Sequence, residues 1–427
     1  MEEKTYGRIG ETLYCGTLTN GLPVYVDVKP GFEKQFAFFA TNYGGMDTRF
    51  QLDGVWQDTP DGVAHFLEHK LFDTEDGNAL QDMAAAGASP NAFTSSAITG
   101  YYFECTEKFR ENLKTLLSFV SIPYFTPESV QKEQGIIAQE IRMGDDDPEQ
   151  QVFLNLMDGL FQNHPVKKHV AGSVESISHI TDKTLYACHK AFYHPGNMVL
   201  CVAGDVDPAG VLALAEEILH QTAGENPPRD YGDAEPQTVA QSEITVSMEV
   251  SKPLFQVGFK AENVPNGPEK LRVQLLAELT GEALFGSSSP LYAKLYGEGL
   301  IDGQFSYGYE SYPGCALLCA GGESRDPQAV RDAILAEAVR IGTAGIEASL
   351  WQRLKKAAYG NRVRGLNSFE NVCIELAQGH FAGAEYLSFP EAFDAISKED
   401  AEDCIRRWIV PARTSLSVIK PKEDAKA

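Results

Sequence analysis

The sequence has no run of about 18 or more apolar residues, which is the length that a membrane-spanning helix needs. Its first residues also lack the basic and apolar regions of a secretory signal. Basic residues are scarce, because 36 Lys and Arg stand against 60 Asp and Glu, for a formal net charge of −24. Nucleic acid needs a basic protein surface, so it is disfavoured as a partner. We expect neither a membrane span nor a nucleic-acid partner.

No two of the eight cysteines form a CxxC pair, and Cys201 and Cys319 lie in apolar, strand-like runs. Scattered thiols of this kind are typical of buried free cysteines in a reducing compartment. We therefore expect a cytoplasmic location. Cys315 and Cys319 are a weak candidate for a metal-ligand pair, because they have no partners in the sequence pattern.

The length of 427 residues predicts more than one domain, since domains usually hold roughly 100–200 residues. Residues 221–240 are polar, contain three prolines and show no apolar period, which is typical of a linker. Strand and helix signals alternate on both sides of this segment. We predict the α+β class, with two α/β-sandwich domains of similar fold at 1–222 and 243–427 and a linker at 223–242.

Local patterns predict the main secondary-structure elements. Residues 34–42 and 99–105 are rich in aromatic and β-branched residues, which favours strands. Apolar periodicity predicts helices near 61–72 and 78–86 and from Pro127 to Met143. The same patterns predict strands at 198–203, 242–250, 254–260 and within 305–321, and helices from Pro208, at 267–284, 289–298 and 327–342, and from Glu347.

The stretch HFLEH, from His65 to His69, places two histidines four residues apart with Glu68 between them. On a helix these positions share one face, so the two imidazoles can converge. Such a pair suits zinc, which needs a third protein ligand and an open position for catalysis. Glu68 could then take a proton from zinc-bound water. The alternative is a pair of structural or solvated histidines, but the apolar neighbours favour metal, because a buried His, His, Glu cluster without an ion is costly.

The third ligand should come from a different helix downstream, as in the inverzincin pattern H-x-x-E-H. The candidates are Glu104, Glu107, Glu111, Glu128, Glu133, Glu140 and the run from Asp145 to Asp147. Glu133 and Glu140 are seven residues apart, almost two helical turns, so they point to the same side. Ile136, Ile137 and Ile141 would dock this helix. One glutamate could ligate while the other supports the site, and the spacing does not choose between them. The alternative is two solvated glutamates.

Residues 91–105, NAFTSSAITGYYFEC, follow a breaker and become strand-like. A polar, irregular strand near a zinc site could be a sheet edge that pairs with an extended peptide. The signal is weak by itself, because other edge strands with serine and threonine have the same pattern.

Together these residues resemble the insulinase-type zinc peptidases, the family of pitrilysin, insulin-degrading enzyme and the mitochondrial processing peptidase. The resemblance rests on HFLEH at 65–69, NAFTS at 91–95, EQGIIAQEIRM at 133–143 and FYHPGNMVLCVAGDVD at 192–207. Residues 284–310 and 364–370 are similar to the bacterial YmfH-type branch. The second half contains no counterpart of HFLEH.

The resemblance implies a role for each matched residue. His65, His69 and Glu140 would be the zinc ligands, and Glu68 the general base. Glu133 would support the site from the same helix as Glu140. The strand residues Asn91, Ala92 and Phe93 would bind the substrate.

The resemblance further implies a zinc-dependent endopeptidase that hydrolyses unfolded peptides in a closed chamber of four such domains. A chain of two domains supplies one half of this clamshell, so we expect a heterodimer with a homologous chain lacking the zinc motif, or otherwise a homodimer. Family members also use an Arg and Tyr pair from the half without zinc to bind carbonyl oxygens of the substrate. The strand block after 305 contains Tyr307, Tyr309 and Tyr312 but no arginine before Arg325. This favours a heterodimer, in which a homologous partner chain supplies the pair, over a homodimer. The alternative is a binding or assembly subunit of a heteromeric peptidase complex, inactive without its partner.

Overall fold

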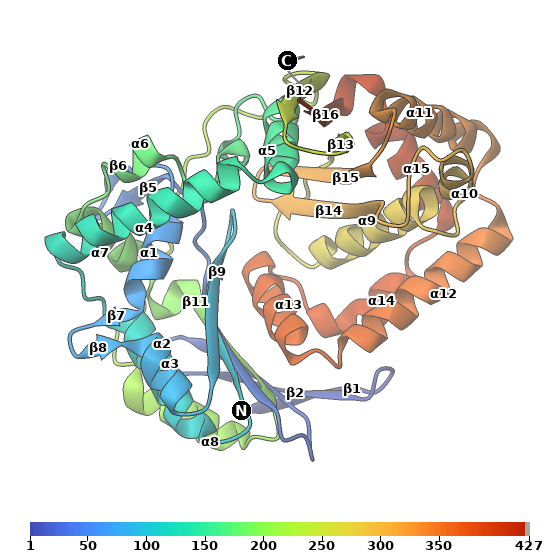
Figure 1. Ribbon diagram of the computed structural model, residues 1–427. Helices are drawn as coiled ribbons and strands as arrows, with labels where there is room; N and C mark the ends of the chain where they lie inside the picture. The colour runs from blue at the N-terminus through green and yellow to red at the C-terminus, as the bar shows by residue number, and fades with distance from the viewer. Residues whose placement is uncertain (423–427) are drawn as a thin grey trace. The chain divides into compact units, whose positions relative to one another are not determined.

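The computed structural model describes residues 1–422, and the chain forms two compact units, each discontinuous in sequence (Figure 1). Unit 1 comprises Met1–Ile141, His169–Tyr231 and Val363–Ser388, and unit 2 comprises Arg142–Lys168, Gly232–Arg362 and the chain from Phe389 onward. Each unit contains one large β-sheet with helices packed on it. The predicted α+β class is confirmed.

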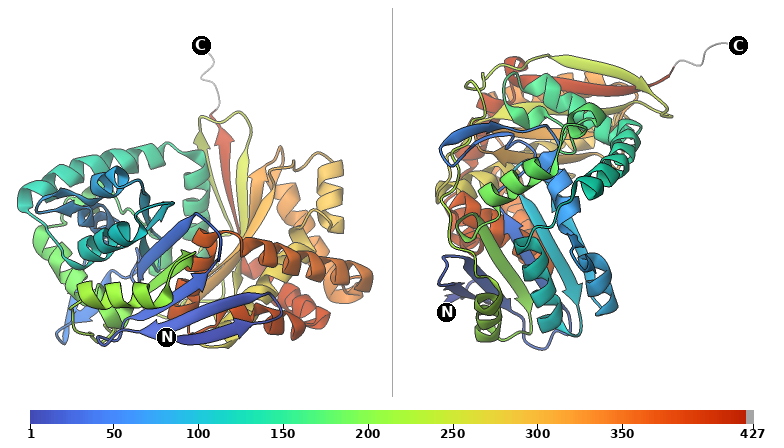
Figure 2. Two further views of the ribbon diagram at one scale, coloured as in Figure 1. Left: turned by 90° about the horizontal axis from the view of Figure 1, so that it is seen from below. Right: turned by 90° about the vertical axis from the view of Figure 1, so that its left-hand side faces the viewer.

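The large sheet of unit 1 has seven strands in the order β1-β2-β3-β11-β4-β10-β9. Strand β11 pairs parallel with β3 and antiparallel with β4, and every residue of β11 is buried, as its apolar run requires. Strand β9 lies at one edge, and β1 and β2, in dark blue, lie side by side at the other (Figure 2). The strand bounds are β1 Glu2–Tyr6, β2 Glu11–Thr17, β3 Pro23–Val28, β4 Gln35–Thr41, β9 Ser89–Thr94, β10 Thr99–Cys105 and β11 Met198–Gly204.

Helices cover both faces of this sheet (Figure 1). One face packs against α1, α2, α3 and α8, and this side contains the main hydrophobic core. The remaining helices of unit 1 are α4, whose last turn lies in unit 2, α6, α7 and α13. The bounds are α1 Val63–Leu71, α2 Ala79–Ala85, α3 Phe109–Ser121, α4 Pro127–Asp145, α6 Val174–Ile177, α7 Asp182–Phe192, α8 Pro208–Ile218 and α13 Phe369–Ala382, with hairpins β5 Arg49–Leu52 to β6 Val55–Asp58 and β7 Asp73–Thr74 to β8 Gly77–Asn78.

Unit 2 contains a five-stranded sheet in the order β12-β16-β13-β15-β14. Its strands are β12 Glu243–Met248, β13 Leu254–Ala261, β14 Ser306–Tyr312, β15 Cys315–Glu323 and β16 Thr414–Pro421. The helices are α5 Pro148–Leu160, α9 Glu269–Phe285, α10 Pro290–Gly297, α11 Pro327–Ala344, α12 Ala348–Gly365, α14 Phe389–Asp394 and α15 Lys398–Trp408, and α12 ends in unit 1. Short 3-10 helices lie at Pro195–Asn197 and Tyr386–Ser388 in unit 1 and at Pro165–Lys167 and Pro411–Arg413 in unit 2.

The two units differ from the continuous domains expected at 1–222 and 243–427, because two segments cross between them. Helix α5 lies in the first half of the sequence but packs on β13 and β16 of unit 2. Helix α13 lies in the second half but packs on β11 and β4 of unit 1. In both cases an apolar helix face packs against strands that are distant in sequence. The composition along the chain does not reveal such long-range contacts.

The segment expected as a linker, 223–242, is divided between the two units, with residues 223–231 in unit 1 and residues 232–242 in unit 2. Arg229 forms a β-bridge with Phe50, and the Tyr231 hydroxyl donates a hydrogen bond of 2.9 Å to Asp47 Oδ1 in unit 1. Arg229 and Tyr231, two of the polar residues that suggested a linker, therefore contact the buried carboxylate of Asp47.

The cysteines agree with the expectation of buried free thiols. All eight cysteines are free, and six of them are buried. Among residues 1–422 we find no helix with the length and the apolarity that crossing a membrane requires.

We predict that Val372→Asp releases α13 from the sheet. Val372 is fully buried, so a carboxylate there lacks the hydration it has in the unfolded chain, and the free energy of unfolding should fall by about 2–5 kcal/mol. The measurement is chemical denaturation together with hydrogen exchange of residues 363–388. Asn371→Asp is the matched control, since it adds the same charge at the neighbouring exposed position. Equal stability of the two variants would contradict this packing.

Candidate functional site

Helix α1 carries the HFLEH stretch, and its position is set by packing and by one glycine. Phe66 and Leu67 are fully buried in the core of unit 1. The helix begins after Gly62, whose φ of 94° is unfavourable for other residues, and a Cβ there would lie 2.4 Å from the Ala171 carbonyl oxygen. The Ser176 hydroxyl also donates a hydrogen bond of 2.7 Å to the Asp61 carbonyl. The start of α1 is therefore fixed against residues 171–176.

Helix α4 carries the two glutamates that the sequence singled out. Ile137 and Ile141 are buried in the same core as α1, as expected. Ile136 is 48% exposed, so its expected docking role is wrong. The physical reason is the helical period, since adjacent residues differ by about 100° around the axis and Ile136 is rotated away from the face that Ile137 buries.

The side chains of His65, His69 and Glu140 converge between these two helices. His65 Nε2 lies 3.3 Å from Glu140 Oε1, and His69 Nε2 lies 3.5 Å from Glu140 Oε2. One possible ligand atom from each of the three residues lies within 4.8 Å of the other two. Ligands at roughly 2.0–2.2 Å from a tetrahedral zinc ion are about 3.3–3.6 Å apart. The donor set and its spacing therefore fit a zinc ion.

Glu133 lies on the other side of the His69 ring. Its Oε1 is 3.1 Å from His69 Nδ1, which leaves Nε2 of this ring facing Glu140. Burial alone would lower the pKa of His69, but the hydrogen bond to Glu133 and the charges of Glu68, Glu140 and Glu133 outweigh burial and raise this pKa. A carboxylate in this place fixes the tautomer and the orientation of a ligating imidazole.

Glu140 is held in its ionised form by its surroundings. The hydrogen bond from His65 lowers the pKa of the Glu140 carboxyl, burial opposes this, and the positive potential of His65, His69 and His169 adds to the lowering. Its side chain is about half exposed, whereas that of Glu133 is 14% exposed. The more accessible of the two carboxylates is thus the one that faces both histidines.

Glu68 points to the sheet side of α1 and contacts β9. The residue is 8% exposed, and its Oε2 accepts a hydrogen bond of 2.6 Å from the Thr94 hydroxyl. Thr94 ends β9 and lies inside the NAFTS stretch, but it was not among the residues expected in the site. The sequence did hold a signal for Thr94. Side chains alternate between the two faces of a strand, so Thr94 lies on the same sheet face as Ala92, which was expected to bind substrate.

The residues expected to bind substrate lie on the edge strand β9. Asn91, Ala92 and Phe93 pair with Tyr102, Tyr101 and Gly100 of β10. Phe93 stacks on Phe38, with 5.8 Å between the ring centroids. Within residues 1–422 no strand pairs with the other side of β9, so its outer edge carries the backbone groups that an added strand would use.

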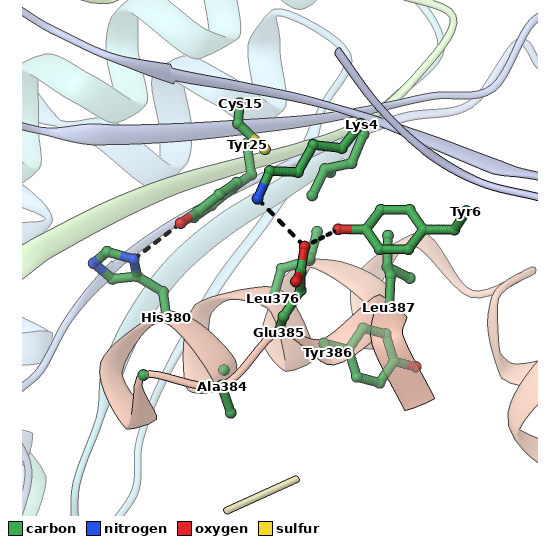
Figure 3. A pocket seen from close by; sticks show the side chains of 13 residues that line it. Lys4, Tyr6, Cys15, Tyr25, Leu376, His380, Ala384, Glu385, Tyr386 and Leu387 are labelled. Carbon is green, nitrogen blue, oxygen red and sulfur yellow. Dashed lines mark hydrogen bonds and ion pairs between the residues drawn. The ribbon is translucent and has the colours of Figure 1, made fainter. Parts of the chain in front are cut away.

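A pocket of about 250 Å³ also lies in unit 1, between strands β1 to β3 and α13 (Figure 3). Glu385 accepts hydrogen bonds from the Tyr6 hydroxyl, at 2.5 Å, and from Lys4 Nζ, at 3.3 Å. The Tyr25 hydroxyl lies 3.1 Å from His380 Nδ1. None of the residues expected to bind metal or substrate lines this pocket, so it is distinct from the histidine cluster.

Comparison with known proteins places this site in a family. Residues 53–174 match the family described as Insulinase (Peptidase family M16), and residues 179–358 match the Peptidase M16 inactive domain. The chain is 38% identical over 426 residues to an uncharacterized zinc protease, YmfH, from Bacillus subtilis (strain 168), which covers 98% of both chains. The chain belongs to peptidase family M16. The resemblance to the insulinase-type peptidases is thereby confirmed.

Solved structures of M16 proteins show the same fold. An M16-like peptidase from Alicyclobacillus acidocaldarius has a TM-score of 0.92 at 31% identity, and the match covers 96% of this chain and 99% of that chain. Pitrilysin has a TM-score of 0.77 at 16% identity, which is a likeness of fold alone. The match covers 99% of this chain but 46% of the pitrilysin chain. One chain of this M16 protein therefore corresponds to about half of pitrilysin.

Proposed function

We propose that this M16 protein is a zinc-dependent endopeptidase that hydrolyses unfolded peptides. The observation that carries the proposal is the convergence of two imidazoles and one ionised carboxylate, from His65, His69 and Glu140, beside the buried Glu68. Nitrogen and oxygen donors at this spacing suit zinc. Relatives described as zinc proteases, YmfH among them, support the assignment.

In this proposal His65, His69 and Glu140 hold the zinc ion, and Glu133 orients His69 through Nδ1. When bound, zinc supplies a Lewis acid that polarises a carbonyl and lowers the pKa of water to roughly 7. Glu68 acts as the general base, which accepts a proton from the attacking water and returns it to the leaving amine. Because Glu68 lies on the same helix as both histidines, its carboxylate would lie beside the metal without being a ligand.

The edge strand β9 provides a place for the substrate. An extended peptide that pairs with the backbone of Asn91, Ala92 and Phe93 would become the next strand of the unit 1 sheet. Pairing through backbone groups depends little on side chains, which suits an enzyme that accepts unfolded segments. Asn91 is exposed at this edge and would contact the peptide directly.

We also propose that the active assembly is a dimer, in which a homologous chain without the zinc motif completes a closed chamber. The correspondence of this chain to about half of pitrilysin supports this. In the strand block after 305, the Tyr307 hydroxyl donates a hydrogen bond to Glu282 and Tyr309 stacks on Trp408, so both tyrosines have partners within this chain. An Arg and Tyr pair from another chain would then bind the substrate.

Replacing Glu68 with Gln should lower kcat/KM for an unstructured fluorogenic peptide by about 10²–10⁴, the range that a general base contributes. The zinc content, measured by mass spectrometry, should stay at one ion per chain. Glu75→Gln is the control, because Glu75 is exposed on the hairpin after α1. Wild-type turnover by the Glu68 variant would show that this residue is not the base.

The two glutamates of α4 should differ in their effect on zinc affinity. Glu133→Gln removes a partner of His69 and should weaken zinc binding about 10–100-fold, whereas Glu140→Gln removes a ligand and should weaken it further. Competition titration against a zinc-chelating dye measures both affinities on otherwise matched variants. If Glu133→Gln had the larger effect, the roles of the two carboxylates would have to be exchanged.

Peptide cleavage should require the partner chain. We expect the chain alone to bind zinc but to cleave peptides slowly, and the mixture with a homologous two-domain M16 chain lacking HxxEH to show cleavage that a chelator abolishes. Sedimentation of both samples reports the assembly. Equal cleavage by the chain alone would refute the need for a partner while leaving the zinc chemistry intact.

A further inference from the structure

We propose that Thr94 is a positioning residue that holds the Glu68 carboxylate for proton transfer, an inference that rests on the proposed peptidase function. The Thr94 hydroxyl donates to Glu68 Oε2 at 2.6 Å, a distance typical of a strong bond between a hydroxyl and a carboxylate. Within residues 1–422 the structure gives Glu68 Oε1 no hydrogen-bond partner. One oxygen is therefore anchored and the other is available to a water molecule.

A glutamate side chain has three rotatable bonds, so the carboxylate of an unanchored Glu68 would sample several orientations. A general base works only when the accepting oxygen lies within hydrogen-bond reach of the proton it removes. A single bond to one carboxylate oxygen reduces this freedom at the end of the side chain, where the packing of α1 has the least effect. The Thr94 hydroxyl makes that bond.

Thr94 is itself held by the turn that follows it. Within this turn the Ser95 amide donates to the Ile98 carbonyl at 2.8 Å. The turn is joined to residues 44–46, because the Gly45 amide donates to the Ser95 carbonyl and the Met46 amide to the Ser96 carbonyl, both at 3.0 Å. A Cβ on Gly44 would lie 2.4 Å from the backbone of this turn. The end of β9 is thus fixed by backbone contacts on two sides.

The buried carboxylate of Asp47 holds the loop at 44–46 in place through a hydrogen bond. Asp47 is fully buried and accepts hydrogen bonds of 2.9 Å from the Gly44 amide and from the Tyr231 hydroxyl. Arg229 Nε lies 3.5 Å from Asp47 Oδ1 and provides the opposite charge. The polar segment that resembled a linker in the sequence therefore helps to set the position of Thr94.

Thr94 is also the last residue of the strand to which we assign substrate pairing. The strand that would bind the peptide backbone therefore also carries the residue that holds the base. Because the peptide would pair with backbone groups of this strand, loss of the Thr94 hydroxyl should reduce the rate of the chemical step more than it reduces peptide binding.

The experiment compares Thr94→Val with Thr94→Ser in the active assembly, whether this is the chain alone or the chain with its partner. Valine keeps the shape and removes the hydroxyl, so kcat should fall about tenfold to hundredfold, the range for losing a hydrogen bond to a charged group. KM should change less than threefold, and zinc content and melting temperature should match the wild type. Serine keeps the hydroxyl and should restore kcat to within threefold of the wild type.

The inference is overturned if Thr94→Val keeps a kcat within threefold of the wild type. It is also overturned if the loss lies in KM, in zinc content or in melting temperature, or if serine fails to restore kcat, because these results indicate a role in structure or binding. The proposed function is tested separately by Glu68→Gln. A wild-type rate in that variant removes Glu68 as the base, whereas an inactive Glu68 variant beside a fully active Thr94→Val removes only the role of Thr94.

Discussion

The approach of α1 to α4 is the contact on which the candidate site depends, because each helix carries only part of the side-chain set proposed to hold zinc. Helix α1 provides His65 and His69, and α4 provides Glu140. The two helices share one hydrophobic core, in which Phe66 and Ile137 are both fully buried. Apolar burial thus brings together charged and polar groups that would otherwise stay apart in water.

The sheet of unit 1 adds a second constraint, since its edge strand β9 also contacts α1. The hydrogen bond between Thr94 and Glu68 joins strand and helix. Behind it, the buried pair of Asp47 and Arg229 supports the loop against which the end of β9 packs. A buried ion pair contributes little net stability, because desolvation of both charges offsets their attraction, but its fixed geometry can specify position. The site thus has a chain of polar contacts extending into its scaffold.

Much of the local structure could be predicted from the sequence, but the assembly of its parts could not. Helix α4 is observed at Pro127–Asp145 against a prediction of Pro127 to Met143, and β10 falls on the predicted 99–105, since periodicity and composition are local properties. Strands β1 to β3 were not predicted, although Pro23–Val28 alternates, and neither was the exchange of α5 and α13 between the halves of the chain. These features depend on which distant apolar surfaces meet.

The sequence by itself determined which side chains are candidates to ligate a metal and how they are spaced within each helix. Two histidines four apart and two glutamates seven apart must share a helical face, because the helical period is set by the backbone. Only the tertiary structure decided that Glu140 faces both imidazoles while Glu133 contacts Nδ1 of His69, and that Thr94 contacts Glu68. Those distances join segments far apart in sequence, so they are fixed by the packing of the whole unit 1 core.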